Sequence, residues 1–250
     1  MTDLVKKLGM AHKNLDQKAY QIIKEMINDR RLAPGDKISQ ERLAAELGIS
    51  RTPLINALKY LEKEKLIVAK PRRGFFVRAF DHHEMVSIFE LREVLEGLAA
   101  RRAAMTVTDR QVDQLRKFFS DFIGKSTITN HRDYCHEDRR FHNHVTKIAA
   151  REFLQSILST YNIISFSYQL VSSEGLVRSP DETLNEHLAI IDAICQRDPE
   201  SSETMMRLHF KRTIAHLRDM AETNPAVTRK FSDNNGMVQQ QGEGRKMAAR

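Results

Sequence analysis

The strongest constraint on the fold lies in residues 32–74, where turn signals separate short segments of helical periodicity. The tripeptide Pro34-Gly35-Asp36 predicts a turn, because proline presets φ and glycine permits a positive φ. Ser39 is then a suitable N-cap for the short helix QERLAAEL, which Gly48 is expected to end. This spacing predicts two short helices joined by a tight turn.

The next segment, SRTPLINALKYLEKE, predicts a second helix that begins at the Ser50 cap and ends near Glu64. Two β-prone runs, LIVAK and FFVRAF, then flank PRRG, and this pattern predicts a hairpin with two arginines and a glycine at its tip. An amphipathic helix from Leu15 to about Arg31 precedes the turn. The order helix, helix, turn, helix, hairpin is that of a winged helix-turn-helix.

Charge is divided unevenly along the chain, whose formal net charge is +7. Residues 14–80 hold 14 Lys and Arg against 8 Asp and Glu, a net charge of +6, whereas residues 81–222 hold 18 against 22, a net charge of −4. Ordinary variation in surface charge is one explanation. A basic front on an acidic body also favours a polyanionic partner for the front, and we expect double-stranded DNA.

The second helix of the motif is expected to enter the major groove, and the hairpin to reach a neighbouring groove or phosphates. An arginine can bond guanine O6 and N7 in a bidentate way, and an asparagine can do the same for adenine. Arg42, Ser50, Arg72 and Arg73 are better suited to phosphates or sugar edges. The predicted DNA-binding residues are Arg42, Ser50, Arg51, Thr52, Asn56, Lys59, Arg72, Arg73 and Gly74.

After Phe80 the sequence shows helical patterns only. A long amphipathic helix follows, with Ile88, Leu91, Leu95 and Leu98 as its apolar stripe. Thr108 and Gln111 form a capping-box pair that opens a helix extending to about residue 123. Further helices are expected near residues 131–149, 151–171, 180–196 and 199–222. The predicted fold is mainly α, with an N-terminal winged helix-turn-helix followed by an all-α helical bundle.

These patterns divide the chain into five predicted parts: an N-terminal extension (1–13), the DNA-binding domain (14–78), a linker (79–84), an all-α effector-binding and oligomerisation domain (85–222) and a disordered tail (223–250). The apolar runs are too short to span a bilayer, and no signal-peptide pattern opens the chain. Cys135 and Cys195 show no CxxC spacing. We expect a cytoplasmic protein with reduced thiols and no membrane partner.

Four residues of the helical part are candidate metal ligands. Asp138 and His142 lie one helical turn apart, and His187 and His209 each lie on a further amphipathic helix. One carboxylate and three imidazoles on adjacent helices suit zinc, nickel or manganese. The same residues are also compatible with ordinary hydrogen bonds or solvated side chains, because the sequence alone does not bring the helices together.

Arg92 is a charged residue in the long helix after Phe80, opposite its mostly apolar stripe. An inward arginine must pair with an anion, because an unpaired buried charge costs several kcal/mol. The partner is either Glu96 or Glu90 in a structural ion pair, or an acidic ligand. Arg92 is therefore a candidate effector-binding residue, and Arg178 is a second candidate.

The front of the chain, LAPGDKISQERLAAELGISRTPLINALKYLEKEKLIVAKPRRGFFV, resembles the N-terminal domain of the GntR family of bacterial transcription regulators. The segments FELREVLEGLAARRAA, DRRFH, NEHLAIIDAI and RLHFKRTIAHL resemble the FCD ligand-sensing domain of the FadR-like branch. Many FCD domains bind a metal through an aspartate and three histidines, so the resemblance implies Asp138, His142, His187 and His209 as ligands. Related domains also often carry an arginine at the position of Arg92.

Two positions depart from the family pattern. Ile55 stands where many relatives have a second arginine in the recognition helix, and Glu41 stands where many have an arginine. An isoleucine can contact a thymine methyl group but donates no hydrogen bond. The operator sequence of relatives therefore does not carry over, and Arg51 is the base-reading arginine that the resemblance transfers.

The resemblance implies a ligand-responsive repressor that binds a palindromic operator as a homodimer. A small carboxylate effector would bind at a divalent ion in the C-terminal domain, since such an ion keeps coordination positions open. One alternative is a sensor for which the metal itself is the signal. Another is a metal-dependent hydrolase, but the chain has no HExxH or GxSxG motif, and we predict that it is not an enzyme.

Overall fold

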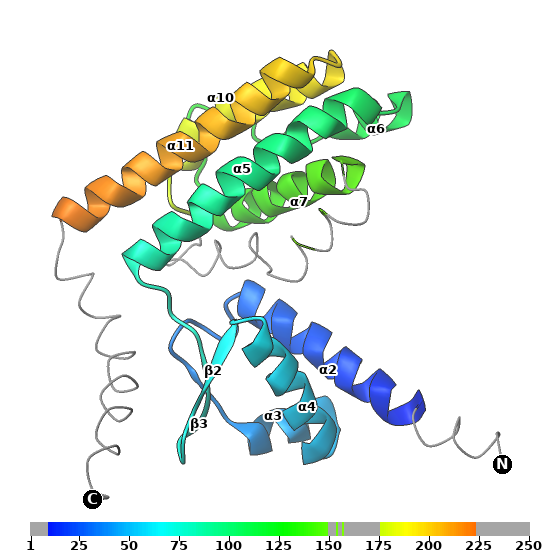
Figure 1. Ribbon diagram of the computed structural model, residues 1–250, viewed down its shortest axis with the longest axis vertical. Coiled ribbons are helices and arrows are strands. Elements are labelled where there is room, and N and C mark those ends of the chain that lie inside the picture. The colour runs from blue at the N-terminus through cyan, green and yellow to red at the C-terminus, as the bar shows by residue number, and fades with distance from the viewer. Residues whose placement is uncertain (1–9, 150–153, 155–156, 158–175, 224–250) are drawn as a thin grey trace, which may run out of the picture. The chain divides into compact units, whose positions relative to one another are not determined.

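The computed structural model describes residues 10–149, 154, 157 and 176–223. The chain divides into two compact units, and the boundary lies between Ala79 and Phe80 (Figure 1). The described part of the first unit contains three helices and a small sheet, and the described part of the second is helical.

Three helices form the core of the first unit: α2 (Met10–Asn28), α3 (Gln40–Leu47) and α4 (Arg51–Lys63). Ser39 caps α3 by accepting a hydrogen bond from the Arg42 amide, and Gly48 ends α3 in the left-handed conformation at φ 62°. The apolar faces of α2 and α4 pack against each other. Their fully buried side chains include Ile23, Ile27, Leu54, Leu58 and Leu61.

A three-stranded antiparallel sheet in the order β1-β3-β2 completes this unit. Strand β2 (Ile67–Lys70) pairs with β3 (Gly74–Val77) in a register that places Lys70 opposite Gly74. The three-residue loop between them contains Arg72 at φ 61°, and Gly74 follows at φ 91°. The short strand β1 (Lys37–Ile38), which the sequence did not predict, joins the other edge of β3. These elements confirm the winged helix-turn-helix.

The described part of the second unit comprises α5 (His82–Thr106), α6 (Asp109–Leu115), α7 (His131–Ala149), α10 (Pro180–Cys195) and α11 (Pro199–Thr223). Helix α5 packs lengthwise against α11, and α7 and α10 also contact α5 (Figure 1). Capping boxes begin three of these helices, at Asp81, Thr108 and Ser179. The mainly α fold predicted from the sequence is confirmed.

The residues predicted as the apolar stripe of α5 do not form its buried face. Leu91 is 53% exposed, and Ile88, Leu95 and Leu98 are only partly covered. The buried face instead carries both apolar and charged residues. The apolar ones include Met85, Phe89 and Ala99, and the charged ones are Arg92 and Glu96. Two charged residues occupy this face because they bond to each other, so hydrophobicity alone identified the wrong side of the helix.

Three predicted boundaries also differ from the structure. Helix α2 begins at Met10, inside the predicted N-terminal extension, rather than at Leu15. Helix α6 ends at Leu115 rather than near residue 123, and Phe119 in the following turns has a φ of 62°. Helix α5 begins at His82, inside the predicted linker, because the Asp81–Glu84 capping box starts it there. The predicted helix over 151–171 and the predicted tail lie outside the described residues, apart from Leu154, Ile157 and Thr223.

Within the described ranges, every helix is too short or too polar to cross a bilayer.

Candidate functional site

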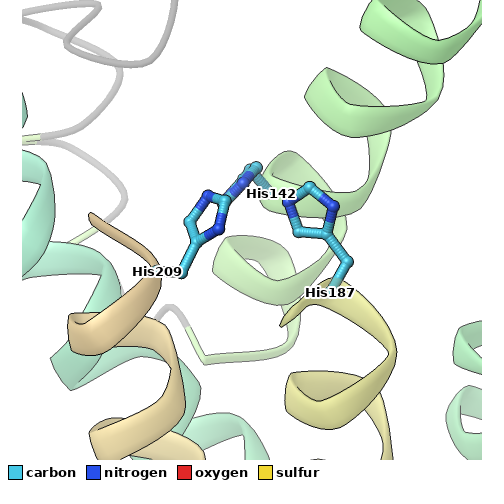
Figure 2. A group of neighbouring side chains, drawn as sticks. All are labelled: His142, His187 and His209. Carbon is cyan, nitrogen blue, oxygen red and sulfur yellow. The ribbon is translucent and has the colours of Figure 1, made fainter. Parts of the chain in front are cut away.

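Three histidines from three helices of the second unit meet in its interior. His142 lies on α7, His187 on α10 and His209 on α11, and Figure 2 shows their rings pointing toward one another. One ring nitrogen from each lies within 4.8 Å of those from the other two. All three side chains are buried. This histidine cluster joins three helices that are well separated along the sequence.

Asp138, the fourth predicted ligand, lies beside the cluster. Its Oδ1 atom is 3.1 Å from Nε2 of His187 and 3.8 Å from Nε2 of His142. Nε2 of His187 is buried, and its geometry gives it no hydrogen-bond partner. A buried ring nitrogen that faces a carboxylate oxygen without a hydrogen bond suits a position where a cation binds between them.

Burial favours neutral imidazoles at His187 and His209, and the neutral ring is the form that binds metal. Burial lowers the pKa of His187, and it lowers the pKa of His209 to about 3, despite the opposing effect of Glu186. Each neutral ring keeps one unprotonated nitrogen, so the donor set of three imidazoles and a carboxylate fits a divalent transition metal.

The sequence did not reveal the residues that contact the other ring nitrogen, Nδ1, of each histidine. Glu96 Oε2 lies 2.5 Å from Nδ1 of His142, and Glu186 Oε2 lies 2.8 Å from Nδ1 of His209. Tyr134 Oη lies 3.0 Å from Nδ1 of His187. The only signals in the sequence were the adjacency of Glu186 to His187 and the one-turn spacing of Tyr134 and Asp138.

Both arginines predicted to bind an effector are bound to glutamates. Arg92 Nε donates to Glu96 Oε1 at 2.6 Å, which is the structural ion pair considered from the sequence. Arg178 donates to both carboxylate oxygens of Glu186, at 2.8 and 2.9 Å. Both arginines therefore stand next to the cluster, each joined to a histidine through one glutamate.

The predicted DNA-binding residues lie on or next to α3, α4 and the hairpin, and all but Asn56 and Gly74 are exposed. Ser50 precedes α4, and its hydroxyl makes no capping hydrogen bond. Lys70 and Arg73 lie over the ring of Phe76, at 4.9 and 5.7 Å from its centroid. The exposed residues are Arg42, Ser50, Arg51, Thr52, Lys59, Arg72 and Arg73, whereas Gly74 and Asn56 are half-buried.

Asn56 differs from the others because its side chain already has a partner. Its amide donates to Asp16 Oδ2 of α2 at 2.9 Å. To contact an adenine, Asn56 would have to exchange this hydrogen bond for one to the base.

A winged helix-turn-helix followed by a helical unit that encloses a buried histidine cluster defines a class, the transcription regulators that combine DNA-binding and ligand-binding domains in one chain. The family model for bacterial regulatory proteins of the gntR family matches residues 15–77, and that for the FCD domain matches residues 87–212. The chain therefore belongs to the GntR family and carries an FCD domain, as its sequence motifs predicted.

Curated relatives support this assignment. The transcriptional repressor RspR of Escherichia coli is 26% identical over 218 residues, covering 84% of this chain and 92% of that protein. The regulator YdhC of Bacillus subtilis is 24% identical over 210 residues, covering 81% and 91%. The family and these relatives are transcription regulators rather than enzymes, which confirms the prediction that this chain is not an enzyme.

Solved structures share the fold. A GntR regulator from Rhodococcus sp. RHA1 superposes with a TM-score of 0.64 at 17% identity, covering 82% of this chain and 97% of that one. McbR/YncC of E. coli superposes with a TM-score of 0.65 at 17% identity, covering 82% and 98%.

Proposed function

We propose that this GntR regulator is a repressor whose FCD domain holds a divalent metal ion at His142, His187, His209 and Asp138, and that a small carboxylate effector binds at this ion. The observation that carries the proposal is the convergence of three buried imidazoles, from three helices, beside a carboxylate. Buried imidazoles that face one another without hydrogen bonds between them are costly, and a shared cation removes that cost.

The donor set narrows the choice of metal. Imidazole ligands suit zinc and nickel, and a carboxylate among them also allows manganese. His142, His187, His209 and Asp138 would hold the ion, and a carboxylate effector would add an oxygen ligand to it. When bound, the ion supplies a positive centre for an acid such as a sugar acid.

The two candidate effector arginines constrain how an acid binds. Arg178 or Arg92 would contact the effector either by releasing the glutamate that it binds in the structure or by sharing its guanidinium between the two acids. Arg178 is the better placed of the two, because its side chain is 10% exposed and that of Arg92 is 3% exposed. A carboxylate that replaces Glu186 on Arg178 would offer the same bidentate geometry.

We further propose that the protein acts as a homodimer on a partly palindromic operator, because two-fold symmetry in the protein requires matching half-sites in the DNA. The exposed apolar residues of α5, Leu91, Val94 and Met105, supply a surface for the second copy. The curated relatives whose names include "transcriptional repressor", RspR and NanR, support repression as the mode of action.

The effector can switch the regulator only if it binds one arrangement of the DNA-binding domains better than another. We expect the effector to favour the arrangement that does not bind DNA, so that it acts as an inducer in the cytoplasm. The ion is then a tightly held cofactor rather than the signal.

Metal analysis of the purified protein, followed by a thermal-shift screen of organic acids, tests this proposal. We expect about one divalent ion per chain, and an acid that both raises the melting temperature and weakens operator binding in a gel shift. An Asp138→Ala variant should lose both responses. A protein without metal, or one that no carboxylate affects, would contradict the proposal. Operator affinity that follows free zinc or nickel without any acid would identify a metal sensor instead.

A further inference from the structure

The Nδ1 atoms of all three clustered histidines contact buried or nearly buried side chains that do not belong to the ligand set. The partners are Glu96 for His142, Tyr134 for His187 and Glu186 for His209. They come from α5, α7 and α10, so each is fixed by a different helix. We propose that Glu96, Tyr134 and Glu186 are positioning residues that place the proton of each imidazole on Nδ1 and thereby direct all three Nε2 lone pairs at one ion. This inference rests on the metal site proposed above and extends it to three residues that would not touch the ion.

The direction of the hydrogen bonds around Tyr134 fixes the tautomer of His187. Thr183 Oγ1 donates its only proton to the carbonyl oxygen of Ser179 at 3.1 Å. With its proton in that bond, Thr183 accepts from the Tyr134 hydroxyl, 2.9 Å away. Since the tyrosine proton is used in that bond, the tyrosine oxygen must accept from Nδ1–H of His187, 3.0 Å away. Nε2 of His187 therefore carries a lone pair that faces Asp138.

The two glutamates impose the same tautomer on the other histidines, because an ionised carboxylate only accepts hydrogen bonds. Glu96 Oε1 accepts from Nε of Arg92 at 2.6 Å, so the carboxylate whose other oxygen contacts His142 is paired with a guanidinium. Glu186 likewise accepts from Arg178 at both carboxylate oxygens and from Arg212 at Oε1, so it too is paired with guanidinium groups. Nδ1 of His142 and of His209 therefore donates.

Aromatic packing fixes the plane of the His187 ring. The ring of Phe119 stacks on that of His187 with a centroid distance of 4.8 Å and an angle of 3° between the planes. Phe119 is itself buried, and Phe141 packs against His187 edge-on with centroids 5.3 Å apart. The plane of the ring is thus set by stacking, and the hydrogen bond to Tyr134 determines which nitrogen faces Asp138.

Partners of this kind orient metal-bound histidines and raise their basicity, and removing one typically weakens metal binding about 10- to 100-fold. The three partners differ in one respect. His142 and His209 donate to carboxylates, whereas His187 donates to the hydroxyl of Tyr134. We therefore expect the glutamates to contribute both orientation and charge, and Tyr134 to contribute orientation.

The experiment measures zinc affinity of the full chain by competition with a chromophoric chelator, for the wild type and for Tyr134→Phe. The phenylalanine keeps the packing and removes only the hydroxyl. Thr146→Val is the matched control, because it removes a buried hydroxyl of the same helix that bonds to the carbonyl oxygen of His142 and not to a ring nitrogen. We expect Tyr134→Phe to weaken zinc binding about 10- to 100-fold, and Thr146→Val to leave it within about three-fold.

A second comparison separates positioning from a merely structural role. Glu186→Gln keeps an oxygen that can accept from His209, whereas Glu186→Ala removes it. We expect the glutamine variant to retain more zinc affinity than the alanine variant. We also expect the visible absorption bands of the cobalt-substituted protein to change in Tyr134→Phe and in Glu186→Ala but to stay unchanged in Thr146→Val.

The outcomes distinguish this inference from the proposed metal site. Loss of zinc binding in His187→Ala together with wild-type affinity and an unchanged cobalt spectrum in Tyr134→Phe would overturn the positioning role and leave the metal site intact. Wild-type zinc affinity in His187→Ala would overturn the metal site itself, and the positioning role with it.

Discussion

Arg92 and Glu96 form an ion pair inside the helical unit, one turn apart on α5, with Nε 2.6 Å from Oε1 and side-chain exposures of 3% and 1%. Replacing one member of such a pair leaves the other charge buried, which typically costs about 3–5 kcal/mol. We predict that Arg92→Met, which preserves most of the volume, lowers the free energy of unfolding by about this amount. Urea denaturation in the presence of a chelator measures the effect without a contribution from bound metal.

Arg218→Met is the control for this prediction. Arg218 of α11 pairs with Glu90 of α5, but the two side chains are 60% and 47% exposed. An exposed pair contributes about 0–1 kcal/mol, so this variant should unfold close to the wild type. Similar decreases in the free energy of unfolding in both variants would show that burial does not increase the contribution of the Arg92 ion pair to stability.

The same ion pair shows why the orientation of α5 could not be predicted from hydrophobicity. Leu91 and its neighbours form a regular apolar stripe, but the interior side of the helix carries Arg92 and Glu96. A charged pair is buried here because each charge satisfies the other and Glu96 also reaches His142. A hydrogen bond between residues on two different helices leaves no periodic signal in the sequence. By contrast, the short helices and hairpin of the first unit depend on local turn and capping residues, and those were predictable.

Metal removal is predicted to destabilise the protein. At a metal concentration about 1,000-fold above the dissociation constant, bound metal adds about 4 kcal/mol to the unfolding free energy. For a chain of this size that corresponds to a melting temperature roughly 8–16 °C higher. We expect a chelator to lower the melting temperature of the metal-bound protein by this amount and zinc to restore it, as measured by differential scanning calorimetry.

The response should depend on the histidine cluster and not on histidines in general. His187→Ala is expected to melt at the same temperature with and without zinc. His216, also on α11 but outside the cluster, offers the control, since His216→Ala should keep the full response. A chelator effect that persists in His187→Ala would place the metal elsewhere.

The candidate site was predictable in its ligands but not in its surroundings. The spacing of Asp138 and His142 places both on one face of a helix, and the family motifs supplied the histidines of two further helices. The sequence could not indicate that Glu96, Tyr134 and Glu186 bond to the ring nitrogens, because glutamates and tyrosines are common and their partners are set by packing between helices. For the same reason, it could not indicate that an arginine holds Glu186 in place.

The exposed apolar face of α5 gives a prediction about assembly. Leu91 is 53% exposed and Val94 is 49% exposed, one helical turn apart. If a second copy covers them, a charge at this face should break the dimer, because it would be buried without a partner. We expect Leu91→Glu to shift the protein from dimer to monomer in light scattering coupled to size exclusion. Ile123 is equally exposed but lies outside α5, so Ile123→Glu should remain dimeric.

DNA binding provides the last prediction, which separates base reading from phosphate binding. Because Ile55 and Glu41 depart from the family pattern, the operator must first be selected from random duplexes. Arg51 is exposed at the start of α4, where a bidentate contact with guanine contributes about 1–3 kcal/mol of discrimination. We therefore expect Arg51→Ala to weaken binding to the selected operator and to relax preference at one base pair of each half-site.

Arg73 is expected to behave differently, because it lies in the loop of the hairpin and is assigned to phosphate. Arg73→Ala should weaken binding to all sequences to a similar degree and reduce the slope of log affinity against log salt concentration by about 0.9 for each phosphate that the arginine neutralises. Fluorescence anisotropy with operator and scrambled duplexes at several salt concentrations measures both effects. An unchanged salt slope in Arg73→Ala, or a uniform weakening across sequences in Arg51→Ala, would reverse the roles assigned to the two arginines. The distinction holds because a phosphate is present at every step of the duplex, whereas the paired acceptors of guanine occur only where the sequence provides them.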